Sequence, residues 1–133
     1  MTKPSWLPRS LVTGPYVALC TTPAQFAAAL KKLKCKEPVA FPSSGGLMEA
    51  FEGASGGLSC VVCIAGGKKR DPVQVVGLLV HEAVHVWQAF CDHIGETAPS
   101  AEFEAYSIQA IAMRLIEAYP NPKEKKHAKV NAR

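Results

Sequence analysis

The segment DPVQVVGLLVHEAVHVWQAFCDHIG, residues 71–95, decides the fold. Asp71 followed by Pro72 is a typical helix start, because an aspartate caps the first free N–H groups and proline suits the first helical position. Gly95 is a typical helix end. Between these limits apolar residues cover nearly the whole circumference. The segment therefore predicts one long helix, buried in the middle of the domain.

The few polar side chains of this helix mostly follow one line along it. Four of them share a stripe at 3.6 residues per turn, with Gly77 beside them: Gln74, His81, His85 and Gln88. Burying two imidazoles without partners costs free energy, whereas a metal ion between them satisfies both. Histidines four residues apart project from successive turns and reach one zinc ion at about 2.0–2.1 Å. The pair therefore predicts two zinc ligands.

Glu82 lies between the two histidines in the sequence and about 100° around the helix from His81. This position is poor for a third ligand on the same side, but a carboxylate there can hydrogen-bond a water at the metal. We expect Glu82 to act as a general base. The alternative is that His81 and His85 are core residues with ordinary hydrogen bonds.

A second long helix begins near Ser100 and stops at Pro120. It offers two candidates for the third zinc ligand. Glu104 heads an otherwise apolar stripe and should face the core, while Glu102 shares its stripe with Tyr106. Glu104 is the preferred candidate. Its alternative role is a favourable interaction with the positive end of its own helix.

The first half of the chain predicts shorter elements. Strands are expected at 16–20 and 39–41, a helix at 22–34, and the two arms of a hairpin at 47–51 and 58–65. With the two long helices that follow, this order predicts an α+β fold in which the helices pack on one face of a small mixed sheet. The loop GGKKR, residues 66–70, lacks the spacing of a phosphate-binding loop, and we expect it to be solvated.

Length and charge indicate one domain with a basic end. The chain has 133 residues, 48% of them hydrophobic and 20% charged, which is typical of a globular protein. The net charge of +4 lies within 120–133, and 1–119 holds ten basic and ten acidic residues. We therefore expect a single domain at 1–119 and a solvated tail at 120–133. A nucleic-acid-associated role for that tail is an alternative, which the neutral body argues against.

The N-terminus contains no apolar run long enough for a signal peptide or a membrane span. Five cysteines, an odd number at low density, favour a reducing compartment, so we expect a cytoplasmic protein that does not enter a membrane. Cys60 and Cys63 form a CxxC inside the strand 58–65, which should point them to opposite faces as core thiols.

These motifs resemble a known family. His81-Glu82-Ala83-Val84-His85, followed after eighteen residues by Glu104, resembles the gluzincin arrangement of zinc metallopeptidases, with the spacing of zinc aminopeptidases. The stretch 102–106, Glu-Phe-Glu-Ala-Tyr, resembles the Glu-x-Glu-Ala-Asn segment of ImmA/IrrE-like bacterial and phage metallopeptidases, with tyrosine in place of asparagine. The aminopeptidases' Gly-x-Met-Glu-Asn motif is echoed only loosely by 46–50. The resemblance covers roughly 71–118.

The resemblance implies a zincin fold and a zinc-dependent peptidase acting on a peptide or protein. Zn²⁺ would be held by His81, His85 and Glu104, with Glu82 as the catalytic base that activates a water for amide hydrolysis.

The resemblance also implies that an edge strand of the sheet binds the substrate backbone by strand addition, and 58–65 is the candidate. His93, expected beyond the helix end, and Tyr106 are candidates for stabilising the oxyanion.

A non-enzymatic alternative stays open. The same ligands could hold together a small zinc-stabilised structural or assembly protein, for instance one in a phage particle, with another protein as its partner. The small size favours this alternative. A structural zinc site, however, has four protein ligands and does not need Glu82.

Overall fold

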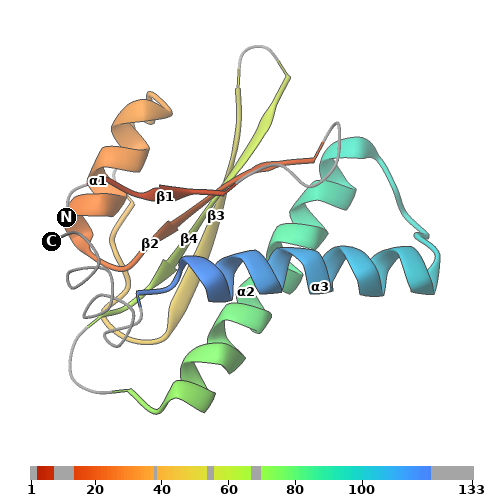
Figure 1. Cartoon of the computed structure of the whole chain (residues 1–133). Coiled ribbons are helices and arrows are strands. Elements are labelled where there is room, and N and C mark those ends of the chain that lie inside the picture. The colour runs from red at the N-terminus through yellow and green to blue at the C-terminus, as the bar shows by residue number, and fades with distance from the viewer. Residues whose placement is uncertain (1–2, 8–13, 38, 54–55, 67–69, 121–133) are drawn as a thin grey trace, which may run out of the picture.

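The computed structural model describes residues 3–7, 14–37, 39–53, 56–66 and 70–120. Four strands and three helices follow one another in the order β1 (Ser5–Trp6), β2 (Tyr16–Cys20), α1 (Pro23–Lys32), β3 (Gly46–Glu52), β4 (Leu58–Ile64), α2 (Pro72–Ile94) and α3 (Ala101–Ala118) (Figure 1). The tail expected at 120–133 lies outside the described residues after its first position. The strand expected at 39–41 is wrong, since no strand forms there, and β1 has no counterpart among the expected elements.

The α+β class and the mixed sheet are confirmed. The strands lie in the order β1-β2-β4-β3, with β2 and β4 parallel and the other neighbours antiparallel. The expectation that 58–65 forms the edge is wrong, because β4 lies between two partners and β3 is the edge strand. Seven consecutive residues of β4 are largely apolar, and a strand apolar on both faces gains most from a central position.

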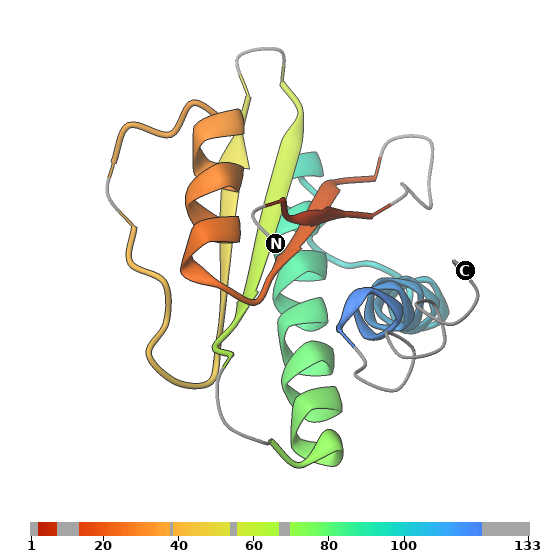
Figure 2. The same cartoon turned by 60° about the vertical axis from the view of Figure 1, so that its left-hand side comes forward.

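Both faces of the sheet are covered. Cys60, Val62 and Ile64 of β4 pack in one core with α2 and α3, while Val61 and Cys63 pack in a second core with α1. Figure 2 shows α1 and α2 on opposite sides of the sheet. The expectation that all helices share one face is therefore wrong, because β4 needs apolar cover on each side. The opposite orientation of the two CxxC thiols is confirmed.

The bounds of both long helices are confirmed by their caps. Asp71 Oδ1 accepts a hydrogen bond of 2.9 Å from the Val73 N–H, and Gly95 closes α2 with a left-handed φ of 73°. Ser100 Oγ caps α3 through the Phe103 N–H at 3.3 Å. Among the described residues, none of the helices combines the length and apolarity that a membrane crossing requires.

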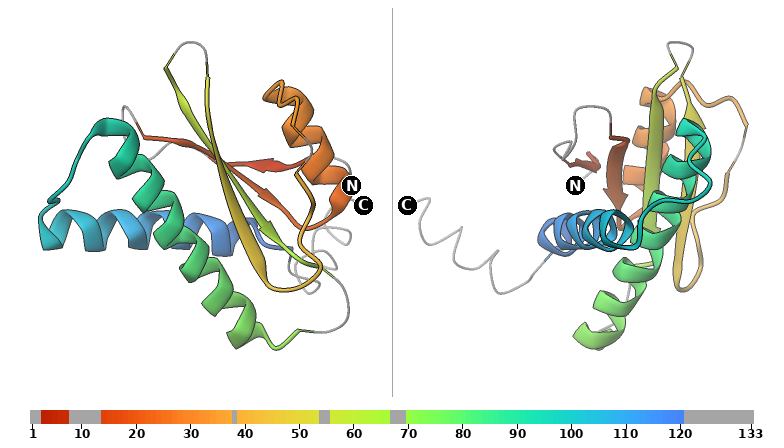
Figure 3. Two further views of the ribbon diagram at one scale, coloured as in Figure 1. Left: turned by 180° about the vertical axis from the view of Figure 1, so that it is seen from behind. Right: turned by 90° about the vertical axis from the view of Figure 1, so that its right-hand side faces the viewer.

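The expectation that α2 is buried all around is wrong. One face packs against β3, β4 and α3, which crosses α2 near its middle (Figure 3). Its buried residues are Val75, Leu79, Glu82, Ala83, Val86, Trp87, Phe90 and Cys91. The opposite face is exposed, including both histidines. The valines in the sequence do not indicate which face of α2 is covered, because Val73 and Val80 are 76% and 39% exposed.

Candidate active site

The two histidines lie side by side on the exposed face of α2. Their Nε2 atoms are 3.2 Å apart, and the ring planes meet at 76°. His85 Nδ1 lies 3.0 Å from Gln88 Oε1. An amide oxygen only accepts, so Nδ1 of His85 carries the proton and its Nε2 keeps a lone pair. Gln88 thus selects the tautomer in which His85 Nε2 can bind a cation or accept a proton.

The spacing of the pair fits two ligands of one zinc ion. Tetrahedral ligands at about 2.0–2.1 Å from zinc lie about 3.3–3.4 Å apart, close to the 3.2 Å seen between the Nε2 atoms. Without a cation, the same distance suits a hydrogen bond from His81 Nε2–H to the lone pair on His85 Nε2. The two imidazoles are therefore already in place for a shared ligand.

Glu82 is the buried acid of the site. Its side chain is 4% exposed, and burial raises the pKa of its carboxyl above the usual value while the charges of His81 and His85 lower it in part. Among the residues the structure describes, no donor hydrogen-bonds this carboxyl. A buried acid without a protein partner, beside two imidazoles, is a group available to a water or a substrate.

A hollow of about 500 Å³ opens beside this acid. It runs along the N-terminal half of α2, and its lining residues are Gly46, Arg70, Gln74, Gly77, Leu78, His81 and Glu82. Gly46 makes room for the acid, since a Cβ built there would lie 2.9 Å from Glu82 Oε1 and 3.1 Å from Ile64 Cδ1. Two structural elements, the start of β3 and the middle of α2, thus converge on the carboxyl of Glu82.

The free edge of β3 runs beside the site. The N–H of Gly53 donates to Gly57 O at 2.8 Å, and the N–H of Ala65 donates to Gly45 O at 2.9 Å. Hydrogen-bonded pairs alternate along an antiparallel ladder, so every second residue between these pairs bonds to β4. The intervening residues direct their N–H and C=O groups outward, namely Gly46, Met48, Ala50 and Glu52. No backbone hydrogen bond reaches that edge within the described part of the chain.

Glu104 is exposed, although the sequence placed it where α3 meets the core; its carboxylate reaches α2 but does not join the histidines. Its Oε2 accepts a hydrogen bond of 2.9 Å from Trp87 Nε1. Trp87 lies about 120° around α2 from His81, on the side away from Glu82. The indole N–H is a largely buried donor that needs an acceptor, and Glu104 supplies it. Glu102 is exposed as well, and the described residues bring no three potential metal ligands together.

The two oxyanion candidates lie away from the hollow. His93 belongs to the last turn of α2, so its expected place beyond the helix end is wrong. Its Nδ1 pairs with Glu52 Oε1 at 3.0 Å, and twelve residues of helix put it about 18 Å from His81. Tyr106 is exposed and lines a separate apolar hollow between α2 and α3.

No family model, curated protein or solved structure matches this chain.

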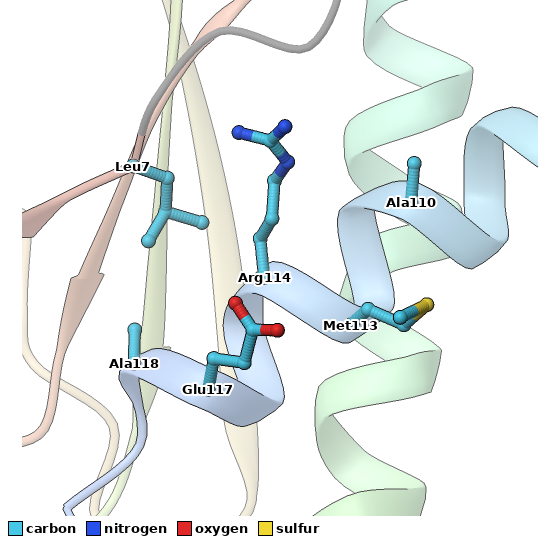
Figure 4. Close-up of a pocket in the computed structure, with 6 residues that line it drawn as sticks. All are labelled: Leu7, Ala110, Met113, Arg114, Glu117 and Ala118. Carbon is cyan, nitrogen blue, oxygen red and sulfur yellow. The ribbon is translucent and has the colours of Figure 1, made fainter.

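A larger hollow lies elsewhere and lacks acid–base chemistry of this kind. It measures about 610 Å³ and lies between Leu7 and the C-terminal half of α3 (Figure 4). Arg114 and Glu117 are the charged residues in its lining, which contains no histidine. Size alone would favour this hollow, but the imidazole pair and the buried acid favour the one beside α2.

Sequence reasoning missed two contributors to the site. Gly46 lies in a glycine-rich stretch, and nothing local indicates that its missing side chain faces Glu82. Arg70 belongs to the loop expected to be solvated, yet it is half-buried and lines the hollow. The sequence did offer one signal for Arg70. It directly precedes Asp71, the cap of α2, and therefore lies at the same end of the helix as Gln74.

Proposed function

We propose that the chain is a zinc-dependent peptidase, with His81 and His85 as metal ligands and Glu82 as general base. The observation that carries the proposal is the 3.2 Å separation of the two Nε2 atoms beside a buried carboxyl that opens into a hollow. Imidazole pairs of this spacing suit zinc, and a buried carboxyl beside them suits proton transfer.

Zinc held by the histidine pair would polarise a peptide carbonyl and make a water more acidic. Glu82 would accept the proton that this water loses as its oxygen attacks the carbonyl carbon. The same carboxyl would then pass the proton to the leaving amine. One water is consumed, the C–N bond breaks, and the products are a carboxylic acid and an amine. Gln88 would hold His85 in the ligating tautomer.

Glu104 completes the proposed ligand set. Its Oε2 is engaged by Trp87 Nε1, and ligating carboxylates are commonly held by such a second hydrogen bond. Because Glu104 and the histidines do not yet form a group of three, zinc binding would have to draw this carboxyl toward the pair. Glu102, exposed two residues earlier, is the competing ligand.

The substrate would be an extended peptide or protein segment lying along the edge of β3. The outward N–H and C=O groups of this strand can form a further ladder, and the strand begins beside Glu82. The five cysteines of the described residues are free thiols, four of them buried, which suits the reducing cytoplasm that we propose as the location.

Peptide cleavage tests the proposal. Zinc-supplemented wild type should hydrolyse members of a mixed peptide library, a chelator should stop this activity, and Glu82→Gln should lower it by about 10²–10⁴-fold while zinc content stays unchanged. Glu49→Gln, a glutamate of the same edge strand region that lies outside the hollow, is the matched control. Full activity of Glu82→Gln would contradict the assigned base.

The ligand set and the non-enzymatic alternative have separate readouts. Zinc content per chain should fall for Glu104→Gln and stay constant for Glu102→Gln. Stoichiometric zinc that raises the melting temperature, without cleavage of any library peptide, would instead support a zinc-stabilised structural or assembly protein.

A further inference from the structure

The hollow beside Glu82 carries a positive group that pairs with no acid of the described residues. Arg70 is half-buried in its wall, and no ion pair of Arg70 occurs among the described residues. The adjacent Asp71 is already engaged, since its Oδ1 caps the Val73 N–H. A half-buried guanidinium that forms no ion pair within the described part of the chain is suited to an anionic ligand.

The surroundings of Arg70 reinforce this preference. The hollow lies along the first turns of α2, where the helix dipole favours negative charge. Gln74 adds a side-chain amide that can donate a hydrogen bond, and Gly77 leaves open space, since nothing lies within 4 Å of a Cβ built there. A planar carboxylate matches the two-pronged donor geometry of arginine.

The distance to the histidines fits a peptide. Seven residues of helix separate Gln74 from His81, about 10 Å, which about three residues of extended chain can span. Gly46, the first residue of β3, lies beside Glu82, whereas Glu52, its last residue, lies beside His93. A peptide added antiparallel to β3, the slightly more stable pairing, therefore enters the hollow with its C-terminal part.

We infer that the hollow at Arg70 is a carboxylate-binding subsite, which selects peptides carrying an acidic side chain or a free C-terminus within about three residues after the reacting bond. The inference deepens the proposed function and rests on it for the peptide character of the ligand. Arg70 is the specificity-determining residue, and Gln74 assists it.

Direct binding tests the subsite without relying on catalysis. Four probes are titrated into ¹⁵N-labelled full chain without added metal: acetyl-Ala-Ala-Glu-Ala-amide, its glutamine counterpart, and acetyl-tetra-alanine with a free or an amidated C-terminus. The amides of Gly46 and Gly77 report on the hollow. We expect the glutamate or the free-carboxylate probe to bind about tenfold more tightly than its neutral counterpart, and the two pairs distinguish the source of the carboxylate.

Variants assign the effect to Arg70. Arg70→Gln should abolish the preference and Arg70→Lys should keep part of it, whereas Lys31→Gln, an exposed cation on α1 across the sheet, should leave it unchanged. Equal affinity for charged and neutral probes, no binding of any probe, or an unaltered preference in Arg70→Gln overturns the inference. If the chain cleaves peptides but does not prefer the charged probes, the subsite alone is overturned. If it prefers the charged probes but cleaves no peptide, the proposed peptidase alone is overturned.

Discussion

The two faces of α2 are built from similar residues but lie in different environments. Leu79 and Val86 are essentially inaccessible between the sheet and α3, whereas Val73 and Val80 are open to solvent, and Val80 directly precedes His81. The buried face stabilises the fold through apolar contact. The exposed face holds apolar side chains and two touching imidazoles that no packing explains. Under the proposed function, the exposed face provides the two metal ligands, whereas the buried face serves stability and contributes Glu82.

The largest expected effect is on the exposed face. His85→Ala should lower peptide hydrolysis at least about a thousandfold, which corresponds to the several kcal/mol that a metal contributes to a transition state. Its free energy of unfolding without metal should change by less than about 0.5 kcal/mol, because the side chain is exposed. Steady-state kinetics and urea unfolding measure the two quantities. A large loss of metal-free stability would show that His85 is a structural residue.

The matched pair Leu79→Ala and Val80→Ala compares the faces directly at neighbouring positions. Leu79 is 1% exposed, and its truncation should cost about 2–5 kcal/mol of unfolding free energy. Val80→Ala should cost less than about 0.5 kcal/mol. Chemical denaturation measures both. Similar losses for the two variants would mean that the exposed face of α2 is covered in solution.

Gly46→Ala tests the contact between β3 and the acid of α2. The added Cβ would meet Glu82 Oε1 at 2.9 Å, so the carboxyl must shift and hydrolysis should fall about tenfold, with about 1 kcal/mol of stability lost. Gly77→Ala is the control for stability, because open space surrounds its Cβ and alanine favours helix by about 1 kcal/mol. Unchanged hydrolysis in Gly46→Ala would contradict a role of the Glu82 carboxyl in the reaction.

The smallest expected effect is a loss of folding stability at alkaline pH, caused by a thiol in the buried core. Burial raises the pKa of Cys60 to about 12 from an ordinary value of 9.0. Above pH 9 the unfolded chain loses this proton while the folded chain keeps it, so the free energy of unfolding falls as pH rises from about 9 toward 12. Urea midpoints between pH 8 and pH 10 should show the decline, and Cys60→Ala should make it shallower. An identical slope in the variant would contradict this role of Cys60.

The sequence predicted correctly those features of the structure that depend on interactions between residues close together in the chain. Asp71 and Gly95 bound α2 because caps act within a few residues, and His81 and His85 meet because helical geometry fixes residues four apart. Strand order depends on pairing between distant segments, so the sequence could not show that β3, rather than β4, forms the edge.

Contacts between helices were equally inaccessible to sequence reasoning. The bond from Trp87 to Glu104 depends on how α3 crosses α2, and no periodicity within either helix encodes that crossing. Arg70 illustrates the same limit for a loop residue, since its place in the hollow depends on where β3 begins.

Zinc binding at the histidine pair tests the central claim most directly. Metal content per chain, measured after equilibrium dialysis against zinc, should be one for the wild type and close to zero for His81→Ala, with Val80→Ala as the neighbouring control that keeps its zinc. We expect this contrast between adjacent residues of one helix face. A wild type without zinc, or a His81→Ala variant that retains one zinc per chain, would contradict it.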